Sequence, residues 1–202
     1  MKTRLQLIPI TLCVLLIGFT ACEDSATGPK STFQLETNTA EDIPANPNAE
    51  RGAPADYTFY DLETGAIVAD EDSATTEWDL GFNATLIIVN TGDSGPGEGG
   101  ALALDVAFEE VNTAPSEGYS EDGIADWYNY TGTEGTPPHT VLPKEDKTFL
   151  IKTGDGEHYA KIQILSYYEG NPEITDETPE SSRYYTFEYA IQLDGSRQFA
   201  EE

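Results

Sequence analysis

Two histidines are the side chains of this chain best suited to bind a metal or a cofactor, because neutral imidazole is a common ligand for transition metals. They are the only histidines among 202 residues. His158 follows a tight turn in "TGDGEHYAKIQ" (153–163), at the start of an alternating strand, and His139 lies in "GTPPHTVLP" (135–143). Prolines stiffen the backbone around His139 and keep it extended. Each position equally suits an ordinary histidine that bonds a carbonyl group or water.

No catalytic motif accompanies these histidines. The sequence has no serine in a glycine elbow, no HExxH motif and no phosphate-binding loop. The Gly-rich run "TGDSGPGEGG" (91–100) lacks the lysine and the strand–loop–helix spacing of a phosphate loop, so we interpret it as a surface loop. Carboxylates are too abundant for any one pair to indicate a site. The sequence therefore predicts a binding protein and not an enzyme.

The charge of the chain excludes several partners. The formal net charge is −27 at pH 7, and it becomes −29 once a signal peptide carrying Lys2 and Arg4 is removed. Nucleic acids and anionic lipid surfaces are therefore poor partners, because like charges repel. The acids are spread along the sequence, which favours a general role in solubility in a saline exterior.

One window of the sequence departs from this acidity. Residues 139–161 carry four lysines and four acids, so the window is formally neutral, and both histidines lie within it. An anionic ligand that needs an imidazole nitrogen would meet the least repulsion here. Chance clustering of lysines in exposed hairpins explains the window equally well.

The first residues are typical of a lipoprotein signal peptide. A short basic start precedes an apolar run over 5–19, which is shorter than the roughly 20 residues that span a bilayer. "FTAC" (19–22) resembles a bacterial lipoprotein box, and "CEDS" (22–25) resembles an acidic signal for the outer face of the outer membrane. We therefore expect a signal peptide over 1–21 and a lipid anchor on Cys22. The only other cysteine lies in the signal, which excludes disulfides and thiolate-bound metals in the folded part.

Residues 22–55 and 56–202 differ in composition. The first segment is rich in Ser, Thr, Asn, Pro and acids and has hardly any large apolar side chains, so we expect a flexible tether. The second segment is long enough for one domain with its own hydrophobic core. We expect its order to begin near Tyr57.

Strand signals dominate the second segment. Alternating or β-branched runs bounded by turn residues occur at 57–70, 75–90, 148–153, 158–168 and 183–195. The first run contains a Thr-Gly turn, and "GDGE" between the third and fourth reads as a hairpin turn.

Two further stretches are less regular. Residues 101–111 fit a strand or a helix, and 120–130 is a short candidate helix. The expected fold class is all-β, a single antiparallel domain.

The alternation over 158–166 predicts which way each side chain points. Ala160, Ile162 and Ile164 form the expected buried set, while Tyr159, Lys161 and Gln163 face the other way. His158 shares the parity of the buried set. It is therefore expected to point toward the interior side at the open rim of the sheet.

Several stretches together resemble the HmuY family of haem-binding surface lipoproteins. They are "NTAEDIPA" (38–45), "YTFYDLETG" (57–65), "WDLGFN" (78–83), "IIVNTGDSGPG" (87–97), "AKIQILSYYEGNP" (160–172) and "YYTFEYAIQLDGS" (184–196). The resemblance implies a twisted antiparallel β-sandwich-like fold, anchored by lipid to the outer membrane and facing the exterior. It also implies capture of haem and its transfer to a TonB-dependent receptor.

The resemblance further implies axial ligands for haem iron, since the best-known member binds iron through two histidines. His139 lies in a context similar to that of many relatives, whereas His158 lies beside an extra residue, where "DGKYAK" would be expected. Lys144, Lys161 and Tyr159 are the candidates to flank the ligand. The alternative is a surface lipoprotein of the same fold that binds a glycan, an aromatic ligand or a partner protein without iron, which the 11 tyrosines would also suit.

Overall fold

The structure, a computed structural model, describes residues 33–50 and 52–200. Its regular elements are antiparallel strands and two short 3-10 turns, which confirms the predicted all-β class. The predicted signal peptide (1–21) and Cys22 lie outside the described residues. Within the described ranges, no helix is long and apolar enough to cross a membrane.

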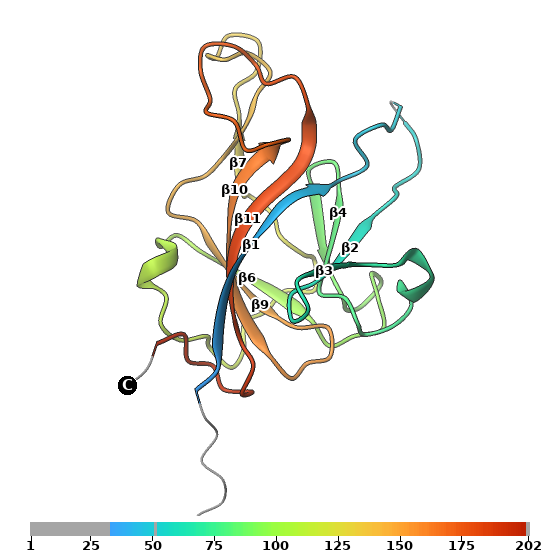
Figure 1. The fold of residues 1–202 in the computed structure, drawn as a ribbon, viewed down its shortest axis with the longest axis vertical. Coiled ribbons are helices and arrows are strands. Elements are labelled where there is room, and N and C mark those ends of the chain that lie inside the picture. The colour runs from blue at the N-terminus through green and yellow to red at the C-terminus, as the bar shows by residue number, and fades with distance from the viewer. Residues whose placement is uncertain (1–32, 51, 201–202) are drawn as a thin grey trace, which may run out of the picture. The chain divides into compact units, whose positions relative to one another are not determined.

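The larger sheet has five antiparallel strands in the order β1-β11-β10-β9-β6 (Figure 1). Their bounds are Leu35–Pro44 (β1), Ser182–Gln192 (β11), Tyr159–Tyr168 (β10), Thr148–Lys152 (β9) and Gly100–Leu104 (β6). The strands β9 and β10 pair around the "GDGE" turn, so the predicted hairpin is confirmed.

A second sheet has the order β3-β2-β4-β5, and β7 and β8 form a separate two-stranded ribbon. The bounds are Thr58–Asp61 (β2), Ala66–Val68 (β3), Leu80–Asn83 (β4), Leu86–Val89 (β5), Tyr128–Tyr130 (β7) and Val141–Pro143 (β8). The two strands predicted over 57–70 and the strands predicted over 75–90 are thereby confirmed.

The core between the two larger sheets is rich in aromatic side chains. Phe82 of β4 contacts Tyr185 and Phe187 of β11, with ring centroids 4.8 and 5.6 Å apart. Tyr60 of β2 meets Phe187 edge-on at 5.5 Å. Such pairs contribute about 0.5–1.5 kcal/mol each beyond the burial of their area. They therefore fix how the smaller sheet packs on the larger one.

The predicted orientation of the side chains of β10 is confirmed on the face of the sheet that meets this core. Ala160, Ile162 and Ile164 are all buried there. The opposite face of the sheet is covered as well, by a second apolar cluster that includes Leu150 of β9 and Phe199 near the C-terminus. Side chains of the larger sheet are therefore buried on both faces.

Lys161 lies on this second face and is only 6% exposed. Its Nζ donates hydrogen bonds to the carbonyl oxygens of Phe108 (2.7 Å) and Val111 (3.0 Å). Burial lowers the pKa of Lys161, because desolvation disfavours the charged ammonium group. The prediction that Lys161 flanks a ligand is wrong, since its ammonium group holds the covering segment that contains the 3-10 turn Phe108–Glu110.

The predicted flexible tether over 22–55 is wrong for its later part. Residues 35–44 form β1, which pairs with β11 along its length. The segment has few large apolar residues, but Ala40 and Ile43 are buried against the sheet, and the strand satisfies the backbone groups of an otherwise open edge.

The short helix predicted over 120–130 is also wrong. This segment runs as turns and isolated bridges, such as Ile87 to Ile124, before it enters β7. Ile124 and Trp127 are buried, whereas Asp126 adopts a φ of 58° that no α-helix contains. Long-range packing of two apolar side chains overrode a weak local preference. The ambiguous stretch 101–111 divides into most of β6 and a 3-10 turn.

Candidate functional site

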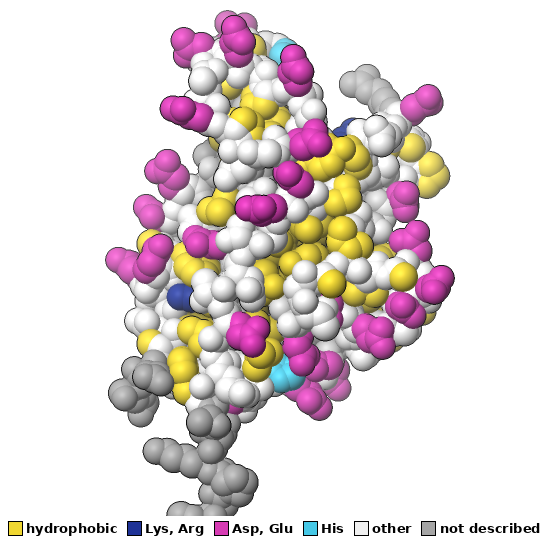
Figure 2. Space-filling model, in the orientation of Figure 1, with side chains coloured by type: hydrophobic (Ala, Val, Ile, Leu, Met, Phe, Trp, Pro, Cys, Tyr) yellow, Lys and Arg dark blue, Asp and Glu magenta, His cyan; other side chains and the backbone are white. Residues whose placement is uncertain are grey.

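The structure does not bring the two histidines together. His158 immediately precedes β10. His139 lies two residues before Val141, whose N–H donates to the Tyr168 hydroxyl (2.8 Å) at the last residue of β10. A ten-residue strand spans about 30 Å, and two residues add at most about 7 Å. Figure 2 shows histidine side chains at two well-separated places on the surface.

The two histidines therefore lie too far apart in this structure to bind one iron together. The ribbon β7–β8 packs at one end of β10, and the β9–β10 turn lies at the other. Pairing of β9 with β10 determines the position of His158. The hydrogen bond from Val141 N–H to the Tyr168 hydroxyl determines the position of His139. Ligation by either histidine alone stays a prediction.

His139 lies on the exposed loop that joins β7 to β8. Its Nδ1 atom lies 2.8 Å from the hydroxyl oxygen of Tyr130, and its backbone N–H donates to the carbonyl oxygen of Gly132 (2.7 Å). Thr131 fastens the same loop, because its hydroxyl donates to Pro137 O (2.7 Å) and accepts from Thr140 N–H (2.8 Å). The imidazole is thus presented to solvent on a well-braced loop.

A partly apolar groove of about 600 Å³ lies beside β8. Its apolar lining comes from β8, β10 and the segment that follows β10, namely Leu142, Pro143, Ile164, Leu165 and Ile174. Lys144 also lines the groove and forms an ion pair with Asp126.

The three residues predicted to flank a ligand lie in different places. Lys144 lies at this groove, whereas Lys161 is buried. Tyr159 packs on Tyr119, with ring centroids 5.9 Å apart, on the face away from the main core.

His158 lies at the other end of β10 and is mostly enclosed, with 15% of its side chain exposed. Its Nδ1 atom is 3.4 Å from Asp155 Oδ2 and 3.9 Å from Glu63 Oε2. Glu63 belongs to the turn between β2 and β3, which tertiary packing brings beside the β9–β10 turn. The predicted inward orientation at the sheet rim is confirmed by this burial.

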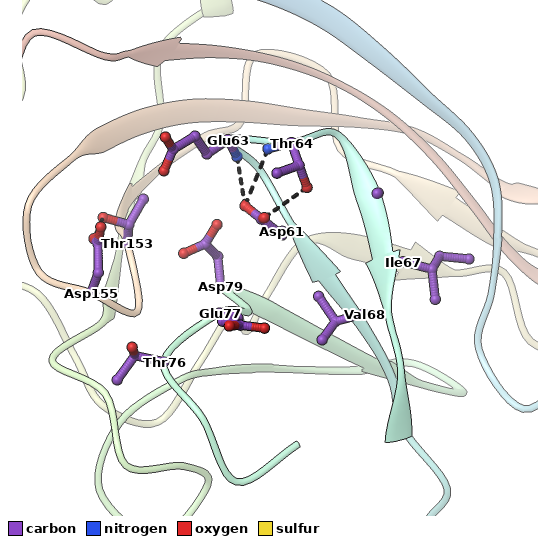
Figure 3. A pocket seen from close by; sticks show the side chains of 11 residues that line it. Asp61, Glu63, Thr64, Ile67, Val68, Thr76, Glu77, Asp79, Thr153 and Asp155 are labelled. Carbon is purple, nitrogen blue, oxygen red and sulfur yellow. Dashed lines mark hydrogen bonds between the residues drawn. The ribbon is translucent and has the colours of Figure 1, made fainter. Parts of the chain in front are cut away.

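Next to His158, the two turns border a cleft of about 490 Å³. Figure 3 shows the carboxylates of Asp61, Asp79 and Asp155 around it, and Glu63 and Glu77 add two more. Such a wall repels anions and attracts cations. Asp61 is held in place by hydrogen bonds from the Glu63 N–H (2.8 Å) and the Thr64 hydroxyl (2.7 Å), drawn as dashed lines in Figure 3.

Comparison with known proteins bears on the β7–β11 part of the chain. The model of the family described as HmuY protein matches residues 123–189. The chain thus matches the HmuY family. No curated protein matches it. The match confirms the family named from the sequence, on the part of the chain that holds both histidines, β9, β10 and most of β11.

Asp79 is a buried acid in the β4 region, outside the HmuY match, and only 5% exposed. Its two carboxylate oxygens accept hydrogen bonds from the backbone N–H groups of Gly154 (2.7 Å) and Leu62 (2.8 Å). Asp79 therefore joins the β9–β10 turn to the β2–β3 turn. Burial raises the pKa of Asp79 to about 7, although the two amide hydrogen bonds act in the opposite direction.

We expect the side-chain carboxyl carbon of Asp79 to titrate near pH 7 in a ¹³C NMR experiment. The folded state then holds this proton more tightly than the unfolded chain does, for which the ordinary value is 3.8. The contribution of Asp79 to the free energy of unfolding should therefore decrease as the pH rises from about 4 to about 7, and stay constant above that. A midpoint near pH 4 would contradict the expectation.

Asn90 is a structural residue that the sequence analysis missed. Its side chain is fully buried and donates to the carbonyl oxygens of Thr75 (2.9 Å) and Trp78 (2.8 Å), while its Oδ1 accepts from Gly97 N–H (3.0 Å). The Gly-rich loop is therefore wrapped around Asn90. A side chain at Gly97 would collide with the Gly154 carbonyl oxygen. The sequence did carry a signal for this role, because Asn90 ends a β-branched run and directly precedes the Gly-rich loop.

Proposed function

We propose that this protein is a surface lipoprotein of the HmuY type that binds haem through His139 and passes it to a TonB-dependent receptor. HmuY proteins are haem-binding surface lipoproteins, and residues 123–189 match their family model. The observation that carries the assignment is the exposed imidazole of His139, which lies on a hydrogen-bonded loop within the matched segment. The ribbon β7–β8 that carries this loop also lines the partly apolar groove, through Asn129, Leu142 and Pro143.

The donor set around His139 fits haem. When the Nδ1–H of the neutral ring donates to the Tyr130 hydroxyl oxygen, the lone pair of Nε2 is free to bind a metal. A hydrogen bond of this kind orients a ligating histidine and raises its basicity. Haem iron bound by one histidine is a known mode of ligation in proteins.

The groove beside β8 supports the same assignment. Leu142, Leu165 and Ile174 offer an apolar surface to a porphyrin face. Lys144 and Glu145 also line the groove, and Lys144 would have to leave its ion pair with Asp126 to meet a propionate. The acidic cleft beside His158 suits haem poorly, because the carboxylates of Asp61, Glu63, Glu77 and Asp155 would repel the propionates. We therefore favour His139 over His158.

Titration of the purified protein with haemin tests the proposal. We expect saturable binding with a Soret band that is shifted from that of free haemin. Absence of such a change would contradict the proposal. It would favour the alternative, a lipoprotein of the same fold that binds a glycan, an aromatic ligand or a partner protein.

Attachment to the outer membrane is a separate part of the proposal. We expect metabolic labelling with a fatty acid to mark the native protein and to fail in a Cys22→Ala variant, because the lipoprotein box ends at this cysteine. A Cys13→Ala variant is the matched control and should keep its label. Label that persists in the Cys22→Ala variant would mean that the protein is anchored otherwise.

A further inference from the structure

The three side chains of Glu63, Asp155 and His158 form a cluster whose purpose haem binding does not explain. One potential ligand atom from each lies within 4.8 Å of the other two. We propose that this cluster binds a divalent transition-metal cation of the Zn²⁺ type at the border of the acidic cleft. The site is distinct from His139 and does not depend on haem.

The spacing of the ligand atoms suits such a cation. Zn²⁺ binds imidazole nitrogen and carboxylate oxygen at about 2.0–2.2 Å, so neighbouring ligand atoms in a tetrahedral site lie about 3.4 Å apart. The distance from His158 Nδ1 to Asp155 Oδ2 already has this value, at 3.4 Å. The distance to Glu63 Oε2 is 3.9 Å, and Glu63 is half exposed, so its side chain is free to close the difference.

The Nδ1 atom of His158 is the observation that points to a ligand. It is enclosed by protein, and among the described residues its nearest acceptor, Asp155 Oδ2 at 3.4 Å, does not meet the geometry of a hydrogen bond. A buried polar atom without a partner costs about 1–3 kcal/mol, so native proteins rarely contain one. A cation between this nitrogen and the two carboxylates would satisfy all three groups. A proton on Nδ1 is the competing occupant, and the experiment below separates the two.

Two of the ligands are pre-organised on the β9–β10 turn. Oδ1 of Asp155 accepts hydrogen bonds from the Thr153 hydroxyl (2.6 Å) and the Glu157 N–H (2.9 Å), which turns Oδ2 toward His158. The backbone N–H of His158 donates to the Thr153 hydroxyl oxygen (2.9 Å). Little conformational entropy remains to be lost when these two side chains bind a cation.

The chemistry of the donors selects the class of metal. One imidazole nitrogen and two carboxylate oxygens suit Zn²⁺ and related transition metals, whereas Ca²⁺ requires six to eight oxygen ligands. Three protein ligands leave one tetrahedral position for water or another group. The carboxylates of Asp61 and Glu77 in the adjoining cleft raise the local concentration of cations. A bound metal would also tie the β2–β3 turn to the β9–β10 turn.

Calorimetric titration of the chelator-treated protein with ZnCl₂, in 0.15 M NaCl and without haem, tests the proposal. We expect one saturable site in the native protein. His158→Gln and Asp155→Asn should each raise the Kd at least about tenfold, because each removes one ligand. Asp155→Asn retains Oδ1, so it preserves the hydrogen bonds of the turn. Glu157→Gln is the matched control, since it removes one charge from the same turn without removing a ligand, and it should change the Kd less than about twofold.

Three results would overturn the metal site. The native protein could fail to bind Zn²⁺, the two ligand variants could bind it as tightly as the native protein does, or Glu157→Gln could weaken binding as much as they do. The last result would indicate general attraction of cations to an acidic surface. The ¹⁵N shifts of the His158 ring give a second readout in the native protein, and Zn²⁺ should perturb them at constant pH. A ring that responds to pH but not to Zn²⁺ would mean that a proton is the occupant.

Discussion

Replacing His139 with alanine is expected to abolish coordination of haem iron, while replacing His158 with alanine leaves it unchanged. His139 is the exposed histidine of the HmuY match and lies on the loop of the ribbon that lines the apolar groove, whereas His158 lies about one strand length away. Neither change should unfold the protein, because His139 is exposed and His158 lies at the rim of the sheet. Absorption spectra recorded during haemin titration measure the effect.

The hydrogen bond that His139 Nδ1–H donates to the Tyr130 hydroxyl oxygen provides a graded control for the same assignment. A Tyr130→Phe variant keeps the ring and removes the hydroxyl group that lies 2.8 Å from His139 Nδ1. Loss of such a partner typically weakens metal binding about 10- to 100-fold, so haemin affinity should decrease without disappearing. Wild-type spectra from His139→Ala would contradict ligation by His139. Loss of coordination in His158→Ala alone would move the site to the opposite end of β10.

Replacing Asn90 with alanine is expected to lower the free energy of unfolding by about 3–5 kcal/mol. The side chain makes three hydrogen bonds in a fully buried site, and each buried partner left without one costs about 1–3 kcal/mol. The partners are the carbonyl groups of Thr75 and Trp78 and the N–H of Gly97, so the loss should loosen the Gly-rich loop as well. Urea denaturation monitored by tryptophan fluorescence measures the change.

Asn48→Ala is the matched control for this measurement, because Asn48 is exposed. It should alter the free energy of unfolding by less than about 0.5 kcal/mol. A decrease below about 1 kcal/mol for Asn90→Ala would show that water or a shifted loop replaces the lost hydrogen bonds. Amide hydrogen exchange of Gly97 would then tell whether the loop itself had moved.

The sequence alone determined the class of the fold and most of its hairpins. Alternating side chains and turn residues are local features, so the hairpin of β9 with β10 and the inward face of Ala160, Ile162 and Ile164 could be predicted from neighbouring residues. Short sequence motifs also revealed the resemblance to the HmuY family. The same local rules indicated that His158 points inward at the rim of the sheet.

Tertiary structure alone decided which distant residues meet. A strand such as β1, with few large apolar side chains, is stable only because β11 offers it an open edge, and no local pattern reveals that edge. The burial of Lys161 depends on a segment that folds back over the second face of the sheet. The two histidines lie 19 positions apart in the sequence, yet they lie at opposite ends of the extended strand β10. Glu63 is far from His158 in the sequence, yet the fold brings the two side chains together. Periodicity reports which face a side chain occupies, but only the pairing and packing of strands sets the distances between side chains, and a binding site is defined by those distances.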